Sequence, residues 1–209
     1  MDELVLYTNP QSRGRIAHWM VEELGQPYRT VWLGYGPEMK SPEYLAVNPM
    51  GKVPAVQFGN DVVVTEAAAI CVWLAERFPE ARLIPPVNDS ARAAFLRWMF
   101  FAAGPLESAI SARSLGWHVP EGKASMVGFG SYDEVIDTLE KAIKPGPFIC
   151  GNQFTAADVY IGSQIGWGLM FGTIEKRPAF ESYFARISER PAAKRTNRIN
   201  EDHLKSLQA

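Results

Sequence analysis

The chain has 209 residues, of which 47% are hydrophobic and 21% are charged, which is ordinary globular composition with enough apolar material for a core. This length allows one large domain or two small ones. The formal net charge of −2 provides no positive field to attract nucleic acid or an anionic membrane, so a small-molecule partner is expected.

The residue pattern indicates neither a targeting signal nor a metal site. The opening segment MDELVLYTNP lacks the basic and apolar runs of a secretion signal, and the least polar stretch, 161–174, is shorter than the roughly 20 residues that span a bilayer. A cytoplasmic protein is therefore expected. Cys71 and Cys150 are far apart, and the three histidines have no metal-ligand spacing, so neither a disulfide framework nor a metal site is expected.

The first part of the chain begins with a predicted strand, helix and strand. Residues 4–7 form a short apolar run, and Ile16, Met20 and Leu24 then recur at helical spacing until Gly25. Residues 28–33 are rich in β-branched and aromatic side chains. A right-handed crossover would make the two strands parallel.

A predicted hairpin and a second helix follow. Residues 53–58 and 62–65 are strand-like and flank the turn Gly59-Asn60-Asp61, so they should pair as antiparallel strands. The segment 66–78 is dense in helix formers and ends before Pro79, with Thr65 expected as its N-cap. The order is β-α-β followed by β-β-α.

The remainder of the chain reads as helical. Residues 80–90 contain prolines and end in capping residues, so they are expected to link a first domain, 1–79, to an all-helical domain, 91–209. Helices are predicted in the later segment at 91–115, 132–143, 156–171 and 179–189. Residues 116–130 form a loop that either borders a ligand cleft or simply connects two helices at the surface.

Three short segments fall where ligands bind in α/β folds. The first, Thr8 to Arg13, joins the first strand to the first helix, where helix amides favour an anion, although Ser12 or Asn9 could merely cap that helix. The second is NPMGKVPAV, in which Pro54 begins a strand. In the third, VVVTEAAAI, Glu66 stands at the start of a helix, where an acid is ordinarily favoured.

These three segments, in this order and followed by a helical second domain, make the chain resemble the glutathione transferase superfamily across nearly its full length. The resemblance implies a thioredoxin-like first domain, a cis bond at Pro54, a homodimer, and the use of glutathione. It also implies that the Val53 backbone pairs with the cysteinyl part of glutathione and that Glu66 holds its amino group. Lys52 and Lys40 would pair with the glycine carboxylate.

One residue departs from the family pattern. Ala67 stands where most relatives have a serine that helps to bind the γ-glutamyl carboxylate, and the loss of one such hydrogen bond should cost about 1 kcal/mol. Backbone amides at the helix start would remain. A second family feature is the capping box formed by Thr155 and Asp158 at the start of an apolar helix.

The residue that activates the glutathione thiol would lie in Asn9-Pro10-Gln11-Ser12, a motif similar to Cys-Pro-x-Cys with both cysteines replaced. Ser12 ranks first and Asn9 second, with Thr8 and Tyr7 behind. Because neither position is a cysteine, a mixed disulfide with glutathione cannot form there. Conjugation of glutathione to a hydrophobic electrophile is the leading function. The alternatives are glutathione-dependent reduction of disulfides or peroxides, and a non-catalytic binding protein with the same fold.

The second substrate is expected against the long helix that begins the second domain. Four large apolar residues are candidate walls, although such stripes belong more often to a core than to a pocket: Trp98, Met99, Phe101 and Trp117.

Overall fold

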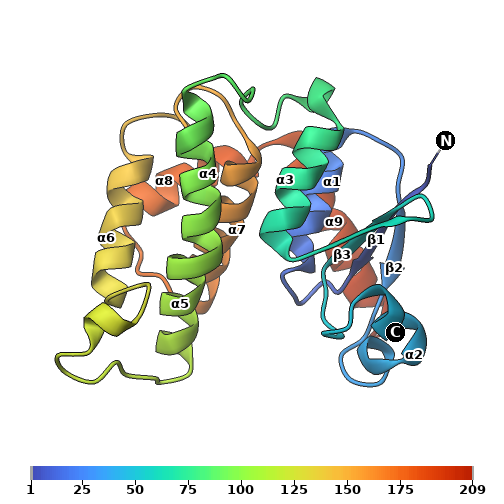
Figure 1. Cartoon of the computed structure of the whole chain (residues 1–209), viewed down its shortest axis with the longest axis horizontal. Helices are drawn as coiled ribbons and strands as arrows, with labels where there is room; N and C mark the ends of the chain where they lie inside the picture. The colour runs from blue at the N-terminus through green and yellow to red at the C-terminus, as the bar shows by residue number, and fades with distance from the viewer. Residues whose placement is uncertain (1, 209) are drawn as a thin grey trace. The chain divides into compact units, whose positions relative to one another are not determined.

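A computed structural model of the chain describes residues 2–208 (Figure 1). Its sheet has four strands in the order β2-β1-β3-β4: β1 (Leu4–Thr8), β2 (Arg29–Trp32), β3 (Ala55–Phe58) and β4 (Val62–Thr65). β1 and β2 are parallel, whereas β3 is antiparallel to both β1 and β4. The predicted parallel pair and the predicted hairpin are therefore confirmed.

Two helices, α1 (Gly14–Leu24) and α3 (Ala67–Arg77), pack against each other and the sheet (Figure 1). Both bury their apolar faces because Ile16, Met20, Ile70 and Leu74 lie on the core side at helical spacing. Gly25 ends α1 in the left-handed conformation, with φ 65°, as the predicted stop requires.

The segment between β2 and β3 contains two short helices that were not predicted. A 3-10 turn covers Glu38–Lys40, and α2 (Pro42–Val47) follows at once. Ser41 caps α2 by accepting a hydrogen bond from the Tyr44 amide at 3.2 Å, and Pro42 occupies the first helical position. The signal was present in Ser41-Pro42-Glu43, but a helix of six residues shows too little periodicity to stand out.

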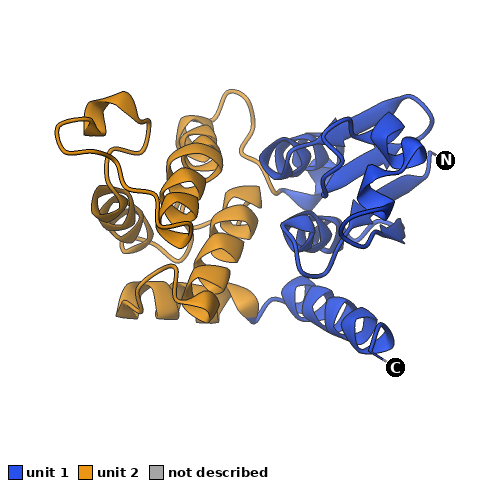
Figure 2. Cartoon of the chain, turned by 90° about the horizontal axis from the view of Figure 1, so that it is seen from below, with its two compact units in different colours: residues 1–82, 189–209 blue, residues 83–188 orange. Residues whose placement is uncertain are grey.

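The last helix, α9 (Pro191–Ser206), packs on α1, so the sheet-containing unit is discontinuous in sequence. Residues 1–82 and 189–209 form one compact unit and 83–188 form the other (Figure 2). Ion pairs Arg190–Glu23 and Arg195–Glu22, each at 2.7 Å, hold α9 to α1. This division differs from the expected helical range 91–209, because the final helix contributes its contacts to the sheet unit.

Among the described residues, the second unit contains helices and no strand. Its α-helices are α4 (Ala91–Phe101), α5 (Glu107–Ser114), α6 (Tyr132–Ile143), α7 (Ala156–Phe171) and α8 (Pro178–Ser188). The predicted helix 91–115 is interrupted by a π-helix over Ala102–Leu106, which contains Pro105. The expected fold class, an α/β domain followed by a helical domain, is confirmed. No helix within residues 2–208 has both the length and the apolar character needed to cross a bilayer.

The capping box of α7 lies in the core of this second unit. Asp158 is fully buried and accepts hydrogen bonds from the amides of Ile149 and Thr155, both at 2.8 Å, and from the Tyr183 hydroxyl at 2.7 Å. The carboxylate therefore ties the start of α7 to the preceding turn and to α8. The predicted box is present, and it connects more of the fold than a cap alone would.

Candidate functional site

The strand register brings the three candidate segments of the sheet unit to one end of the sheet. Tyr7 pairs with Ala55, and Ala55 pairs with Thr65, so these residues form one row across β1, β3 and β4. The chain leaves β1 and β4 just beyond this row and enters β3 just before it. Helices α1 and α3 begin at this end as well, because each follows the end of a strand.

In the first segment, the Asn9 side chain holds the loop in shape. Its amide nitrogen donates to the Leu33 carbonyl at 2.7 Å, and its Oδ1 accepts from the Gln11 amide at 2.8 Å. The residue is only 7% exposed. These contacts connect the end of β1 to the end of β2, which is a structural use of the side chain.

The Ser12 hydroxyl lies at the entry to α1. Its oxygen accepts from the Gly14 amide at 2.9 Å, and the hydroxyl donates to the Asn9 carbonyl at 2.8 Å. Ser12 is half-buried and Arg13 beside it is exposed. The Ser12 hydroxyl is therefore oriented by its own loop and close to the positive end of the α1 dipole.

Thr8 and Gly14 approach each other closely beside Ser12. A Cβ added to Gly14 would lie 2.2 Å from Thr8 Oγ1 and 2.9 Å from Ser12 Oγ, so only glycine fits there without displacement. Thr8 is fully buried, and its hydroxyl has no hydrogen-bond partner among the described residues. Thr8 therefore packs under the loop, and Tyr7 next to it bonds to Gln57 at 2.9 Å.

The second segment enters β3 through a cis peptide bond between Val53 and Pro54, as the family resemblance implies. Upstream, the Lys52 carbonyl accepts from the Tyr44 hydroxyl and the Asn48 side chain, both at 2.7 Å. These bonds fix the backbone path while leaving the Lys52 side chain exposed.

Lys40 reaches the same segment from the 3-10 turn that precedes α2. Its ammonium donates to the Met50 carbonyl at 2.8 Å, and its side chain is exposed. Two cations, Lys40 and Lys52, therefore accompany the entry to β3.

The third segment has an unusual backbone conformation. Glu66 has φ 66° and ψ 119°, a region that side-chain-bearing residues rarely occupy and that is found most often at functional sites. Glu66, and not Thr65, is the residue that caps α3, so the predicted N-cap was wrong. A positive φ at a glutamate could not be inferred from the residue types. Glu66 is exposed and is followed in the chain by Ala67 and Ala68, whose amides have no intrahelical acceptor in the first turn of the helix.

The chemistry of this end of the sheet suits a small zwitterionic ligand. Two helix N-termini and two lysines favour carboxylates or a thiolate, whereas Glu66 favours an ammonium group. The Val53 backbone, which precedes the cis bond at the entry to β3, could offer peptide-like pairing. Ala67 is 8% exposed and carries no hydroxyl, so carboxylate binding at α3 would depend on backbone amides.

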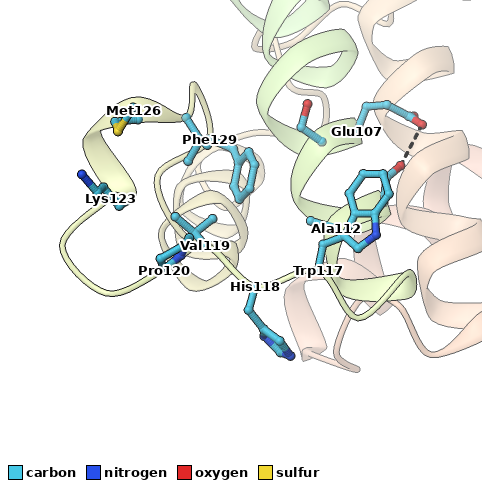
Figure 3. Close-up of a pocket in the computed structure, with 12 residues that line it drawn as sticks. Glu107, Ala112, Trp117, His118, Val119, Pro120, Lys123, Met126 and Phe129 are labelled. Carbon is cyan, nitrogen blue, oxygen red and sulfur yellow. Dashed lines mark hydrogen bonds between the residues drawn. The ribbon is translucent and has the colours of Figure 1, made fainter.

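A separate apolar cavity lies within the helical unit (Figure 3). It has a volume of about 690 Å³, within the ordinary range for small-molecule pockets. One wall is α5, with Glu107, Ser108, Ser111 and Ala112, and the other is the loop after α5, with Trp117, Val119 and Phe129 among its lining residues. The loop 116–130 thus borders a cavity, which was one of its two possible roles.

The predicted second-substrate residues do not gather in this cavity. Trp117 lines it and is 68% exposed, but Trp98 and Met99 are buried in the core and Phe101 packs edge-on against Trp98 with centroids 5.3 Å apart. Phe129 and Glu107 were not anticipated. Two sequence features could have indicated them as lining residues: the apolar side chains of the glycine-rich loop, and the polar face of the helix that precedes this loop.

The two cysteines offer no reactive thiolate. Burial raises the pKa of Cys71 to about 12, and burial followed by the negative charge of Asp158 raises the pKa of Cys150 to about 11. Both are free thiols. No group of three or more His, Cys, Asp or Glu side chains in the described part of the chain has metal-binding geometry.

Family models match both parts of the chain. The model for "Glutathione S-transferase, N-terminal domain" matches residues 13–77, and the one for "Glutathione S-transferase, C-terminal domain" matches residues 91–167. The chain is 25% identical to "Glutathione S-transferase GstA" of Escherichia coli O157:H7, over 89% of this chain and 93% of that protein. It is 27% identical to "Glutathione S-transferase 1" of Schizosaccharomyces pombe, over 84% of this chain and 86% of that protein.

Solved structures agree with these sequence relationships. A glutathione transferase from Methylococcus capsulatus is 25% identical with a TM-score of 0.78, covering 95% of this chain and 98% of that one. A Phanerochaete chrysosporium glutathione transferase, solved in complex with oxidized glutathione, is 25% identical with a TM-score of 0.78, covering 96% and 97%. The chain belongs to the glutathione S-transferase superfamily.

Proposed function

We propose that this protein is a glutathione transferase that binds glutathione at the end of the sheet and activates its thiol for attack on a hydrophobic electrophile. The observation that carries the proposal is the positive-φ backbone conformation of the exposed residue Glu66, which immediately precedes the first amides of α3 in the chain. One ligand ammonium and one ligand carboxylate can be bound together there, as the γ-glutamyl group of glutathione requires. The Phanerochaete chrysosporium relative, which was solved in complex with oxidized glutathione, supports this ligand.

The remaining ligand contacts follow the order of the glutathione peptide. The Val53 backbone pairs with the cysteinyl residue beside the cis bond to Pro54. Lys52 and Lys40 pair with the glycine carboxylate, and the Met50 contact of Lys40 holds that ammonium near the segment. Ala67 contributes only its amide, so affinity is about fivefold lower than with a serine hydroxyl at this position.

Ser12 is the proposed activating residue. Its hydroxyl can turn from the Asn9 carbonyl to the glutathione sulfur while its oxygen keeps the bond from the Gly14 amide. A hydrogen bond to the thiolate of about 1.5–3 kcal/mol, together with the α1 dipole, lowers a thiol pKa by about one to three units. Asn9 is assigned to holding the loop because both ends of its amide are already bonded.

The hydrophobic co-substrate is assigned to the cavity of the helical unit, where Trp117 and Phe129 offer aromatic surface. Such walls suit apolar electrophiles. Reduction of disulfides or peroxides is not favoured by the comparisons, and Cys71 and Cys150 are too weakly acidic to assist it.

We extend the proposal to a homodimer that detoxifies electrophiles in the cytoplasm. The family resemblance supports it, as does the edge strand β4, whose Val62 and Val63 remain 37% and 42% exposed. Light scattering after size exclusion should give twice the mass of 23.2 kDa, and fractionation should recover the protein with cytoplasmic markers.

The activation step is tested by titrating the protein with glutathione in a calorimeter and following thiolate absorbance against pH. Glutathione should bind at millimolar concentration or below, and Ser12→Ala should raise the apparent thiol pKa by a unit or more. Asn9→Ala should instead lower the unfolding free energy. Ser188→Ala, which removes a surface hydroxyl bonded to the Ala185 carbonyl, is the matched control. Absence of glutathione binding by the parent protein would remove the proposed function.

A further inference from the structure

One lining residue of the cavity in the helical unit does not suit a purely apolar ligand. Glu107 is the single acid among the residues that line it, and most of the others carry apolar side chains. A carboxylate in such a wall is unfavourable unless something compensates its charge. The residue therefore has a role in holding either the fold or a ligand.

The carboxylate is fixed from two helices. Its Oε2 accepts from the Gln164 side-chain amide of α7 at 2.9 Å, and Gln164 is only 8% exposed. Its Oε1 accepts from the Ser111 hydroxyl, one turn along α5, at 3.4 Å (Figure 3). The Gln164 bond orients the carboxylate. The Ser111 bond is at the outer limit of hydrogen-bond length and is therefore weak.

Both Glu107 and Ser111 line the cavity. A carboxylate has about four acceptor positions, so Oε1 can accept a ligand donor beside or in place of Ser111. Lys123, the one lysine that lines the cavity, lies at the opposite end from Glu107 (Figure 3).

We propose that Glu107 makes the cavity selective for aromatic molecules that carry a hydrogen-bond donor, such as a phenolic hydroxyl or an amine. The ring lies against Trp117, and the donor reaches Oε1 of Glu107. A hydrogen bond to a charged acceptor contributes about 1.5–3 kcal/mol, or roughly tenfold to 150-fold in affinity. The conclusion that the electrophile itself carries such a donor rests on the proposed function. The preference of the cavity for ligands with a donor does not depend on that function.

The experiment compares two ligands that differ by one donor, 2-naphthol and 2-methoxynaphthalene, by equilibrium dialysis against the full chain at pH 7 without glutathione. The parent protein should bind 2-naphthol about tenfold or more tightly than the methyl ether. Glu107→Gln, which keeps the shape and loses the charge, should reduce this preference to about fivefold or less. Trp117→Ala should weaken both ligands equally, because it removes stacking and leaves the acceptor.

Two matched variants separate selection from structure. Ser108→Ala alters the same wall away from the carboxylate and should leave the preference unchanged. Glu107→Leu combined with Gln164→Leu removes acceptor and partner together, so no buried amide is stranded, and it should abolish the preference while the methyl ether still binds.

Equal binding of the two ligands by the parent protein, binding of neither, or an unchanged preference in Glu107→Gln would each overturn the inference. Titrating the same samples with glutathione separates a failure of this inference from a failure of the proposed function. A protein that fails to bind glutathione but keeps the naphthol preference loses the proposed function alone. One that binds glutathione without the preference loses only the role of Glu107.

Discussion

Gly14 is the residue at which local packing constrains the proposed active loop most tightly. The missing Cβ makes room for two hydroxyl groups, Thr8 Oγ1 and Ser12 Oγ. The Gly14 amide also bonds to Ser12 Oγ, so the glycine sets both the position and one contact of the proposed activating hydroxyl. Its role is to permit close approach, since its φ is not in the left-handed region.

Gly14→Ala should therefore lower the unfolding free energy by about 1–3 kcal/mol and raise the apparent pKa of bound glutathione's thiol, because the new methyl group displaces Thr8 and Ser12. Thr8→Ala in the same chain removes the closest atom and should recover part of the stability. Denaturant unfolding and thiolate absorbance measure the two effects. Gly104→Ala, where no atom lies within 4 Å of the added Cβ in a helical segment, should leave the thiol pKa unchanged and should not lower the unfolding free energy. Additive losses in the double variant would show that Thr8 is not the obstacle.

At the scale of single elements, two capping boxes provide a direct comparison. Ser131 and Glu134 cap α6 at the surface, whereas Thr155 and Asp158 cap α7 in the core. The motif is the same, but its surroundings differ. Among the described residues, the Glu134 carboxylate accepts hydrogen bonds from Ser131 of its own turn. The Asp158 carboxylate also accepts hydrogen bonds from the Ile149 amide and the Tyr183 hydroxyl.

Glu134→Ala should cost about 0.5–1 kcal/mol of unfolding free energy, since water can replace the lost partner. Asp158→Ala should cost about 3–5 kcal/mol because it strands several buried donors. Both values come from urea unfolding of the purified variants. Similar costs would mean that the burial of Asp158 adds nothing to the cap. Glutathione affinity should remain unchanged in any Asp158 variant that still folds.

The sequence predicted elements with strong local signals and missed those whose stability is tertiary. The hairpin turn, the stop at Gly25, and the start of α7 after its capping box were all recognisable. α9 was missed because its buried side chains are small or polar, Ala192, Ala193, Thr196 and Asn200, so no apolar stripe marks it. The conformation of Glu66 and the burial of Trp98 depend on packing that residue types do not encode.

At the scale of the whole molecule, a buried polar chain joins the two ends of the sequence inside the sheet unit. His18 of α1 is fully buried and meets the Tyr28 hydroxyl at 2.9 Å and the Asn200 side-chain amide of α9 at 3.0 Å. Tyr28 donates its proton to Glu22, which Arg195 of α9 also binds. His18 must then donate from Nε2 and accept at Nδ1, so the ring is neutral.

This neutrality couples folding to pH. Burial lowers the pKa of His18 from 6.5 to about 4, although the negative charge of Glu22 favours the protonated form. Between these values the unfolded chain binds a proton that the folded chain does not. The contribution of neutral His18 to the unfolding free energy is thus complete above pH 6.5 and is lost as the pH falls toward 4. The loss is about 2 kcal/mol at pH 5.

His18→Gln isolates this contribution, because a glutamine amide can donate to Tyr28 and accept from Asn200 without titrating. Urea unfolding at pH 7.5, 6 and 5 should show that the parent protein's stability advantage over this variant shrinks by about 2 kcal/mol across the range. Other titrating groups cancel in the difference, and His118→Gln, at an exposed loop position, should follow the parent. Parallel curves for the parent and His18→Gln would mean that His18 takes up its proton as readily in the folded state as in the unfolded chain.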